Sequence, residues 1–216
     1  KAGENIHITA AENRSTSDIQ ESSKSSQAGV GFMPTGNTFY ANSSKGNGNE
    51  TEETVTHTES QVIANKNLTM ESGKDTTLKG SQIQGDTVTM KVGNHLTIES
   101  LQDQDDYHAK NESKGIGFEV GTSRATHKNG AFSVGTTKGQ TNSTYESVTD
   151  QAGIRAGQGG YDITVKGNTH LKGGLIDSDA AKDKNTLTTG TLTWEDIDNK
   201  ADYSSQNKGQ NLTASW

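Results

Sequence analysis

Two consecutive stretches of similar sequence decide the fold. Residues 63–78 read IANKNLTMESGKDTTL, and residues 83–98 read IQGDTVTMKVGNHLTI. Apolar residues recur between them at an offset of 20 positions, which pairs Ile63 with Ile83, Leu68 with Val88, Met70 with Met90 and Leu78 with Ile98. A fixed repeat of about this length indicates a solenoid, in which successive coils stack their apolar residues on one another.

Apolar and polar residues alternate within each stretch, as they do in Leu68-Thr69-Met70 and Ile163-Thr164-Val165. This is the period of a β-strand, and Gly73 and Gly93 follow the strands where a coil has to turn. Short strands separated by glycine corners favour a parallel β-helix. We expect the following side chains to point into its core: Ile63, Leu68, Met70, Leu78, Ile83, Val88, Met90, Ile98, Ile163 and Val165.

The composition allows either a disordered polar linker or a repetitive β structure with a narrow core. Only 27% of the 216 residues are hydrophobic, and there is one proline. Disordered segments are usually rich in proline and poor in β-branched residues, whereas this chain has many Thr, Val and Ile residues. The periodicity therefore favours the β structure. The absence of cysteine excludes disulfides and thiolate metal sites, no apolar run is long enough to span a membrane, and the net charge of −7 argues against nucleic acid as a partner.

Two irregular excursions interrupt the regular coils. We expect residues 1–216 to be one β-helical repeat fragment, with regular coils at 57–102 and 149–198 and excursions at 12–56 and 103–148. Each excursion contains small and apolar residues in alternation, which predicts a β-hairpin or an added sheet, although a disordered loop is the alternative. The apolar side chains would pack on the helix, or would instead meet another protein or a membrane; they are Val30, Phe32, Ile116, Phe118 and Val120.

The repeats also resemble a known family. Asn67 to Met70, Asn94 to Ile98, Lys24 to Phe32 and Lys114 to Gly121 are similar to haemagglutinin-type repeats of two-partner-secretion exoproteins, and the likeness covers nearly the whole chain. The Ser-rich, G-x-G-F interruptions resemble the second filamentous-haemagglutinin repeat type. The resemblance implies an all-β, right-handed parallel β-helix that reaches the bacterial cell surface through an outer-membrane two-partner-secretion transporter. Because the chain begins and ends inside repeats, we expect it to be a fragment.

For members that act in contact-dependent growth inhibition, the resemblance implies a role in delivering a C-terminal toxin across the outer membrane of a target bacterium. The partners would then be that outer membrane or a receptor on its surface. The alternative is an adhesin segment that binds host or bacterial surfaces. A delivery segment and an adhesin segment differ in whether their loss affects toxin entry or attachment.

No residue pattern indicates an enzyme or a cofactor site. The six histidines are scattered at positions 7, 57, 95, 108, 127 and 170, and no HExxH motif is present. Acidic clusters around Asp103 and Asp177 lack the spacing of an EF-hand or of a calcium-binding nonapeptide repeat, although Ca²⁺ stays an alternative to solvated corners. We therefore predict no catalytic residue, no metal site and no cofactor.

Overall fold

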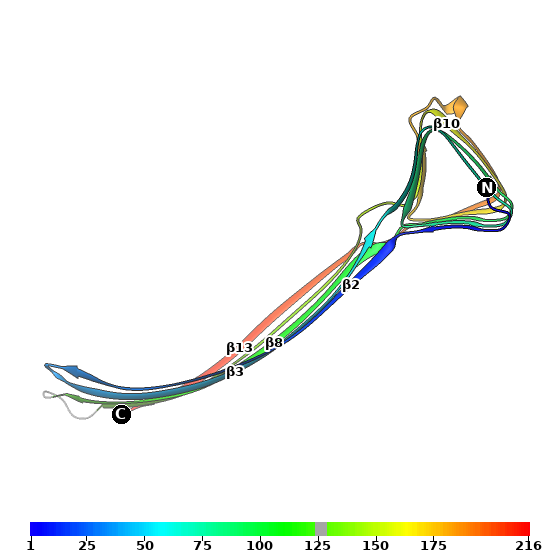
Figure 1. Ribbon diagram of the computed structural model, residues 1–216. Helices are drawn as coiled ribbons and strands as arrows, with labels where there is room; N and C mark the ends of the chain where they lie inside the picture. Colours follow the sequence, from blue (N-terminus) through cyan, green and yellow to red (C-terminus); the bar gives the residue numbers. More distant parts are fainter. Residues whose placement is uncertain (124–128) are drawn as a thin grey trace. The chain divides into compact units, whose positions relative to one another are not determined.

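The computed structural model describes residues 1–123 and 129–216, which form two compact units. The first, called the coil unit, contains residues 1–14, 54–104 and 145–201. The second, called the excursion unit, contains residues 15–53, 105–144 and 202–216. Both units are built from β-strands (Figure 1).

Eight strands form the sheet of the coil unit. They are β1 (Ile6–Thr9), β4 (Ser60–Ser72), β5 (Thr76–Lys79), β6 (Ser81–Val92), β7 (Leu96–Glu99), β10 (Gly153–Lys172), β11 (Leu175–Ser178) and β12 (Thr186–Glu195), with the short 3₁₀ helix η1 (Lys182–Lys184) before β12. Five strands form the sheet of the excursion unit, namely β2 (Ala11–Met33), β3 (Gly36–Thr58), β8 (Gln102–Ser123), β9 (Asn129–Val148) and β13 (Lys200–Ser215).

Strand β10 turns around the coil and pairs in three separate segments. Residues 153–156 pair with β6 and β11, residues 162–165 pair with β6 and β12, and residues 169–172 pair with β7 and β12. Every one of these pairings is parallel, as are those of β1 with β5 and of β4 with β6. The coil unit is therefore a three-sided parallel β-helix, and its three sides are visible around the label β10 in Figure 1. The right-handed sense stays a prediction.

The core of the coil unit is made of columns of side chains from successive coils. Leu78 lies beside Ile98, and Ile98 lies beside Leu171 on the next coil. Because the strands are in register, each apolar side chain contacts similar ones above and below. Of the side chains expected to point inward, these are buried: Leu68, Leu78, Ile83, Val88, Met90, Ile98, Ile163 and Val165. Met70 is half-buried and packs against this core.

The inward assignment of Ile63 is wrong, because 58% of this residue is exposed. Val62, not Ile63, pairs with Ile83, and Ile63 pairs with Gln84. The register shifts between Ala64 and Asn67, where β4 contains one more residue than β6. Such a bulge moves every side chain before it to the opposite face of the strand, so the offset of 20 that holds from Leu68 onward does not hold at Ile63.

Glycines allow the coils to stack closely at one corner. A Cβ atom added to Gly93 would overlap the Gly73 carbonyl, and one added to Gly73 would overlap the carbonyl of Gly3. The Gly93 N–H donates a hydrogen bond to the Ser72 carbonyl oxygen at 3.0 Å. The corner therefore requires residues without a side chain wherever one coil lies directly on the next.

The five strands of the excursion unit form a single antiparallel sheet in the order β13-β9-β8-β3-β2. The hydroxyl oxygens of Ser26 and Ser43 lie 3.1 Å apart across β2 and β3. Asn37, near the start of β3, donates its N–H to the hydroxyl of Thr122, near the end of β8, at 3.4 Å. The excursions thus contain paired strands that add a sheet, as the alternation of small and apolar residues predicts. The predicted excursion at 103–148 includes residues 124–128, which lie outside the described residues.

Candidate interaction surfaces

The cross-strand register of the excursion sheet brings its apolar side chains onto one face. Gly130 on β9 and Trp216, which directly follows the last residue of β13, exchange two backbone hydrogen bonds of 3.1 Å, so they lie directly opposite each other. The Trp216 ring lies over Gly130 and reaches the Phe118 ring, with 6.5 Å between the ring centroids. Side chains alternate between faces along each strand, and directly opposite residues share a face. The face so defined, called the apolar face, carries Val30, Phe32, Phe39, Ile116, Phe118, Val120, Phe132, Val134, Leu212 and Trp216.

The side chains of the apolar face are not covered. Phe32 is 78% exposed, Leu212 is 69% exposed and Val134 is 39% exposed, while Val120 is half-buried. Contiguous exposed apolar surface is uncommon in soluble proteins and usually marks a site of contact with another molecule. Within the described residues, the excursion unit consists of one sheet and offers no second layer to cover this face.

A band of lysines crosses the same face beside the apolar residues. Because Ser26 lies opposite Ser43, Lys24 lies opposite Lys45. An added Cβ on Gly115 would lie 3.9 Å from the Cβ of Ser44, which places Lys114 opposite Lys45. We name the lysine band as one lysine from each strand: Lys24, Lys45, Lys114, Lys138 and Lys208.

Glu112 is the acidic residue set among these lysines. Its Oε1 lies 3.1 Å from Lys114 Nζ and 3.4 Å from Lys138 Nζ. The hydrogen bond from Lys114 outweighs partial desolvation and, with the charge of Lys138, holds the pKa of Glu112 below its usual range. This carboxylate therefore stays ionised at neutral pH and offsets part of the positive charge of the band.

The opposite face of the excursion sheet has a different chemistry. Gly117 and Gly139 face the side chains of Ser133 and Asn111, and Gly29 faces the Tyr40 ring, so this face carries glycine, small polar residues and tyrosine. The alternation also places Glu21, Glu50 and Glu119 there. The two faces therefore differ both in polarity and in the sign of their charge.

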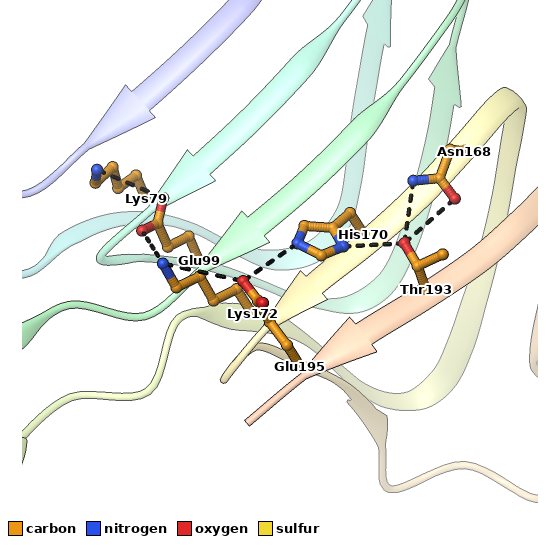
Figure 2. Close-up of polar contacts among 7 residues, drawn as sticks. All are labelled: Lys79, Glu99, Asn168, His170, Lys172, Thr193 and Glu195. Carbon is orange, nitrogen blue, oxygen red and sulfur yellow. Dashed lines mark hydrogen bonds and ion pairs between the residues drawn. The ribbon is translucent and has the colours of Figure 1, made fainter. Parts of the chain in front are cut away.

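Alternating charges form a ladder on the outer surface of the coil unit (Figure 2). Glu99 lies between two lysines of the neighbouring coils, with its carboxylate oxygens 3.4 Å from Lys79 Nζ and 3.4 Å from Lys172 Nζ. Lys172 Nζ also lies 3.9 Å from Glu195 on the next coil. These four residues occupy one register position on β5, β7, β10 and β12, so the ladder favours the in-register stacking of the coils.

Polar side chains beside this ladder interact across β10 and β12. His170 Nδ1 lies 2.9 Å from the Thr193 hydroxyl, and His170 Nε2 lies 3.7 Å from Glu195. Asn168 donates its side-chain amide to Thr193 at 3.2 Å (Figure 2). These contacts satisfy polar groups between neighbouring coils, and we assign them a structural role.

Asp103 accepts three hydrogen bonds within the coil unit. The His57 backbone N–H donates to it at 2.7 Å, the His57 ring nitrogen lies 3.3 Å away, and the Thr149 hydroxyl donates at 2.6 Å. Desolvation opposes ionisation of Asp103, but the hydrogen bonds from Thr149 and His57 outweigh it and lower the pKa of this carboxyl. Asp103 therefore connects His57 and Thr149, which are distant in sequence, by hydrogen bonds.

Metal sites and membrane-spanning helices are absent from the described part of the chain. No group of three or more His, Asp or Glu side chains there is close enough to hold a metal ion. No helix among residues 1–123 and 129–216 has the length and apolar character to cross a membrane. His127 lies outside the described residues.

The structure brings the five predicted excursion residues, Val30, Phe32, Ile116, Phe118 and Val120, onto one face. The sequence reasoning missed five others on that face, namely Phe39, Phe132, Val134, Leu212 and Trp216, and it missed the lysine band. The alternation in Ala131-Phe132-Ser133-Val134 was a signal for part of this set.

Comparison with known proteins places the chain in a family. The family model described as hemagglutinin repeat matches residues 1–114. The chain is 39% identical over 214 residues to a protein named deoxyribonuclease CdiA from Yersinia pseudotuberculosis, with 98% of this chain and 19% of that protein covered. It is also 39% identical over 208 residues to a protein named toxin CdiA from Escherichia coli, with 94% of this chain and 6% of that protein covered. No solved structure matches the chain significantly.

The chain thus spans a fifth or less of the length of these relatives. Hemagglutinin-repeat proteins and their CdiA relatives are secreted and displayed on the bacterial cell surface, and the repeat region is structural. The chain belongs to the hemagglutinin repeat family and is a segment of a two-partner-secretion exoprotein.

Proposed function

We propose that this segment is a structural and translocation module that helps to deliver a C-terminal toxin across the outer membrane of a target bacterium. The whole exoprotein would be exported by an outer-membrane two-partner-secretion transporter and would act in contact-dependent growth inhibition. The segment itself would have no catalytic role, and the activity would belong to the toxin.

The observation that carries the proposal is the uncovered apolar face of the excursion sheet. A passive spacer needs only the coil unit, whose apolar side chains are already buried inside the three-sided coil. The excursion sheet instead exposes side chains such as Phe32 and Trp216, at 78% and 62% exposure. Exposed aromatic and aliphatic groups of this kind favour contact with another surface during delivery.

The test uses a chimera in which this chain replaces the matching segment of the Escherichia coli relative. In a second chimera, short glycine-serine turns replace residues 15–53 and 105–144, which removes four of the five excursion strands and keeps the coils. The ends to be joined already lie together, because Asn13 hydrogen bonds to Thr58 at 3.2 Å and Thr149 hydrogen bonds to Asp103 at 2.6 Å.

Attachment to target cells and inhibition of their growth are then measured separately. We expect the second chimera to attach as the first does and to lose growth inhibition. Loss of attachment would favour the adhesin function instead, and full growth inhibition without the excursion strands would indicate a passive spacer. Either of these results would overturn the delivery function.

A further inference from the structure

We propose that the apolar face and the lysine band together bind a lipid surface that carries anionic phosphate headgroups. This inference rests on the proposed function, because it names the chemistry that the excursion sheet would recognise at a target membrane. The sheet would lie on the bilayer with its apolar face toward the acyl chains and its glycine-lined face toward water.

The first argument is the separation of charge between the two faces. The chain has a net charge of −7, yet the alternation along the strands places all six described lysines of the excursion unit, Lys110 and the lysine band, on the apolar face. Apart from Glu112, the acidic residues that the same alternation places on this face lie at the end of the sheet away from Phe118, namely Asp18, Glu53, Asp106 and Asp202. Glu21, Glu50 and Glu119 lie on the opposite face. A surface that is both apolar and positively charged, on a chain that is negatively charged overall, is complementary to an anionic lipid interface.

The second argument is the position of the band. Lys114 lies two residues from Ile116 on β8, about 7 Å along the strand. A lysine stem of four methylene groups spans about this distance, so the ammonium group reaches the headgroup phosphates while the neighbouring apolar side chain contacts acyl chains. The lysines form a row across the strands rather than a scattered set, which matches the planar arrangement of the headgroups.

The third argument decides between lipid and a second copy of the chain. Two apolar faces packed against each other would bring ten band lysines, five from each copy, into one assembly with only the two copies of Glu112 set among them. Like charges at short distance oppose such a pairing. An anionic headgroup layer instead supplies a counter-charge for every lysine, and lipid is therefore the occupant that the charges favour.

The experiment measures flotation of the purified 216-residue chain with lipid vesicles. Vesicles of phosphatidylglycerol are compared with vesicles of phosphatidylcholine at equal lipid concentration. We expect binding to the phosphatidylglycerol vesicles only, and weaker binding at high salt, because the lysine contribution is screened.

Two triple variants separate the band from the general charge of the chain. In the first, Lys24, Lys45 and Lys114 are replaced by glutamine. In the matched control, the same replacement is made at Lys66, Lys91 and Lys166, which are exposed on the coil unit. Since each lysine near an anionic surface contributes roughly fivefold in affinity, we expect the band variant, which lacks three of them, to bind about 100-fold more weakly, and the control to bind like the parent.

A third variant, Phe32→Ser with Leu212→Ser, tests the apolar contribution at two highly exposed positions. We expect it to retain the preference for phosphatidylglycerol but to bind more weakly. Circular dichroism checks that every variant keeps its β structure, which we expect because the replaced side chains are exposed.

Three results would overturn the inference. They are equal binding to both kinds of vesicle, equal loss of binding in the band variant and its control, and self-association of the chain through the apolar face in sedimentation experiments. If flotation fails while the chimeras behave as expected, only the lipid assignment is wrong. If flotation succeeds while removal of the excursion strands leaves growth inhibition intact, only the delivery function is wrong.

Discussion

Replacement of Ile98 by alanine tests the column that defines the coil unit. Ile98 is 0% exposed and lies between Leu78 and Leu171 of the neighbouring coils. The change removes about three methyl or methylene groups, which costs about 2.4 kcal/mol at about 0.8 kcal/mol for each. A residual cavity of about 70 Å³ adds about 1.7 kcal/mol at about 24 cal/mol per Å³. We therefore expect the free energy of unfolding to fall by about 4 kcal/mol.

The matched control is Ile63→Ala, which makes the same chemical change in the same unit. Ile63 is 58% exposed, so its removal leaves no enclosed cavity. Less than half of its apolar surface is taken from water on folding, and we expect a cost of about 1 kcal/mol or less. The difference of about 3 kcal/mol between the two variants follows from the bulge in β4, whereas the sequence repeat alone would place both isoleucines in the core.

Equilibrium unfolding in urea, followed by circular dichroism, measures both variants against the parent chain. The midpoint should fall much further for Ile98→Ala than for Ile63→Ala. Because each coil contacts only its neighbours, the loss at Ile98 should also loosen the adjacent coils. Equal losses in the two variants, or a larger loss for Ile63→Ala, would refute the register of β4 and the inward column.

Three further changes test other features of the coil unit. We expect Glu99→Lys to lower the free energy of unfolding by about 1–2 kcal/mol, because the new lysine would lie between Lys79 and Lys172, which have the same charge. This loss should be smaller in high salt. The folded chain lowers the pKa of Asp103 from its ordinary 3.8, so the unfolded chain binds the proton more readily. The ionised carboxylate therefore stabilises the fold above about pH 4, and this stabilisation is lost as the pH falls further. We expect Asp103→Asn to make the free energy of unfolding less sensitive to acid when it is measured as a function of pH. Gly93→Ala should destabilise the corner where coils stack, whereas Gly3→Ala, with no atom within 4 Å of the added Cβ, should melt like the parent.

The core of the coil unit could be predicted well where the repeat is regular. Leu68 and Val88 pair as expected, as do Met70 and Met90, because strand alternation and a constant coil length fix both the face and the column. The prediction failed at Ile63, since the sequence contains no signal that distinguishes a coil of 20 residues with a bulge from one without. The bulge changes which residues of β4 and β6 pair before it, while the apolar pattern from Leu68 onward stays regular.

The interaction surface could be predicted only in part. Alternation within a strand indicates Phe118 and Val120, but Phe39 is followed directly by Tyr40, and this pair hides the alternation. The lysine band depends on which residues of five strands lie opposite one another, and that register arises from contacts between segments far apart in sequence, such as Ser26 with Ser43. Long-range register is a property of the folded sheet and has no counterpart in the local sequence.

The two units are stabilised differently, although both contain few apolar side chains. The coil unit closes on itself, so one thin set of columns buries Leu78, Ile98 and their neighbours completely. The excursion unit is a single sheet, whose order comes from cross-strand hydrogen bonds and whose apolar side chains contact one another but have no second layer to pack against within the described chain. A single sheet gains stability when another surface covers its apolar face. The same feature that limits the stability of the excursion sheet therefore gives it a reason to bind, which a closed coil does not have.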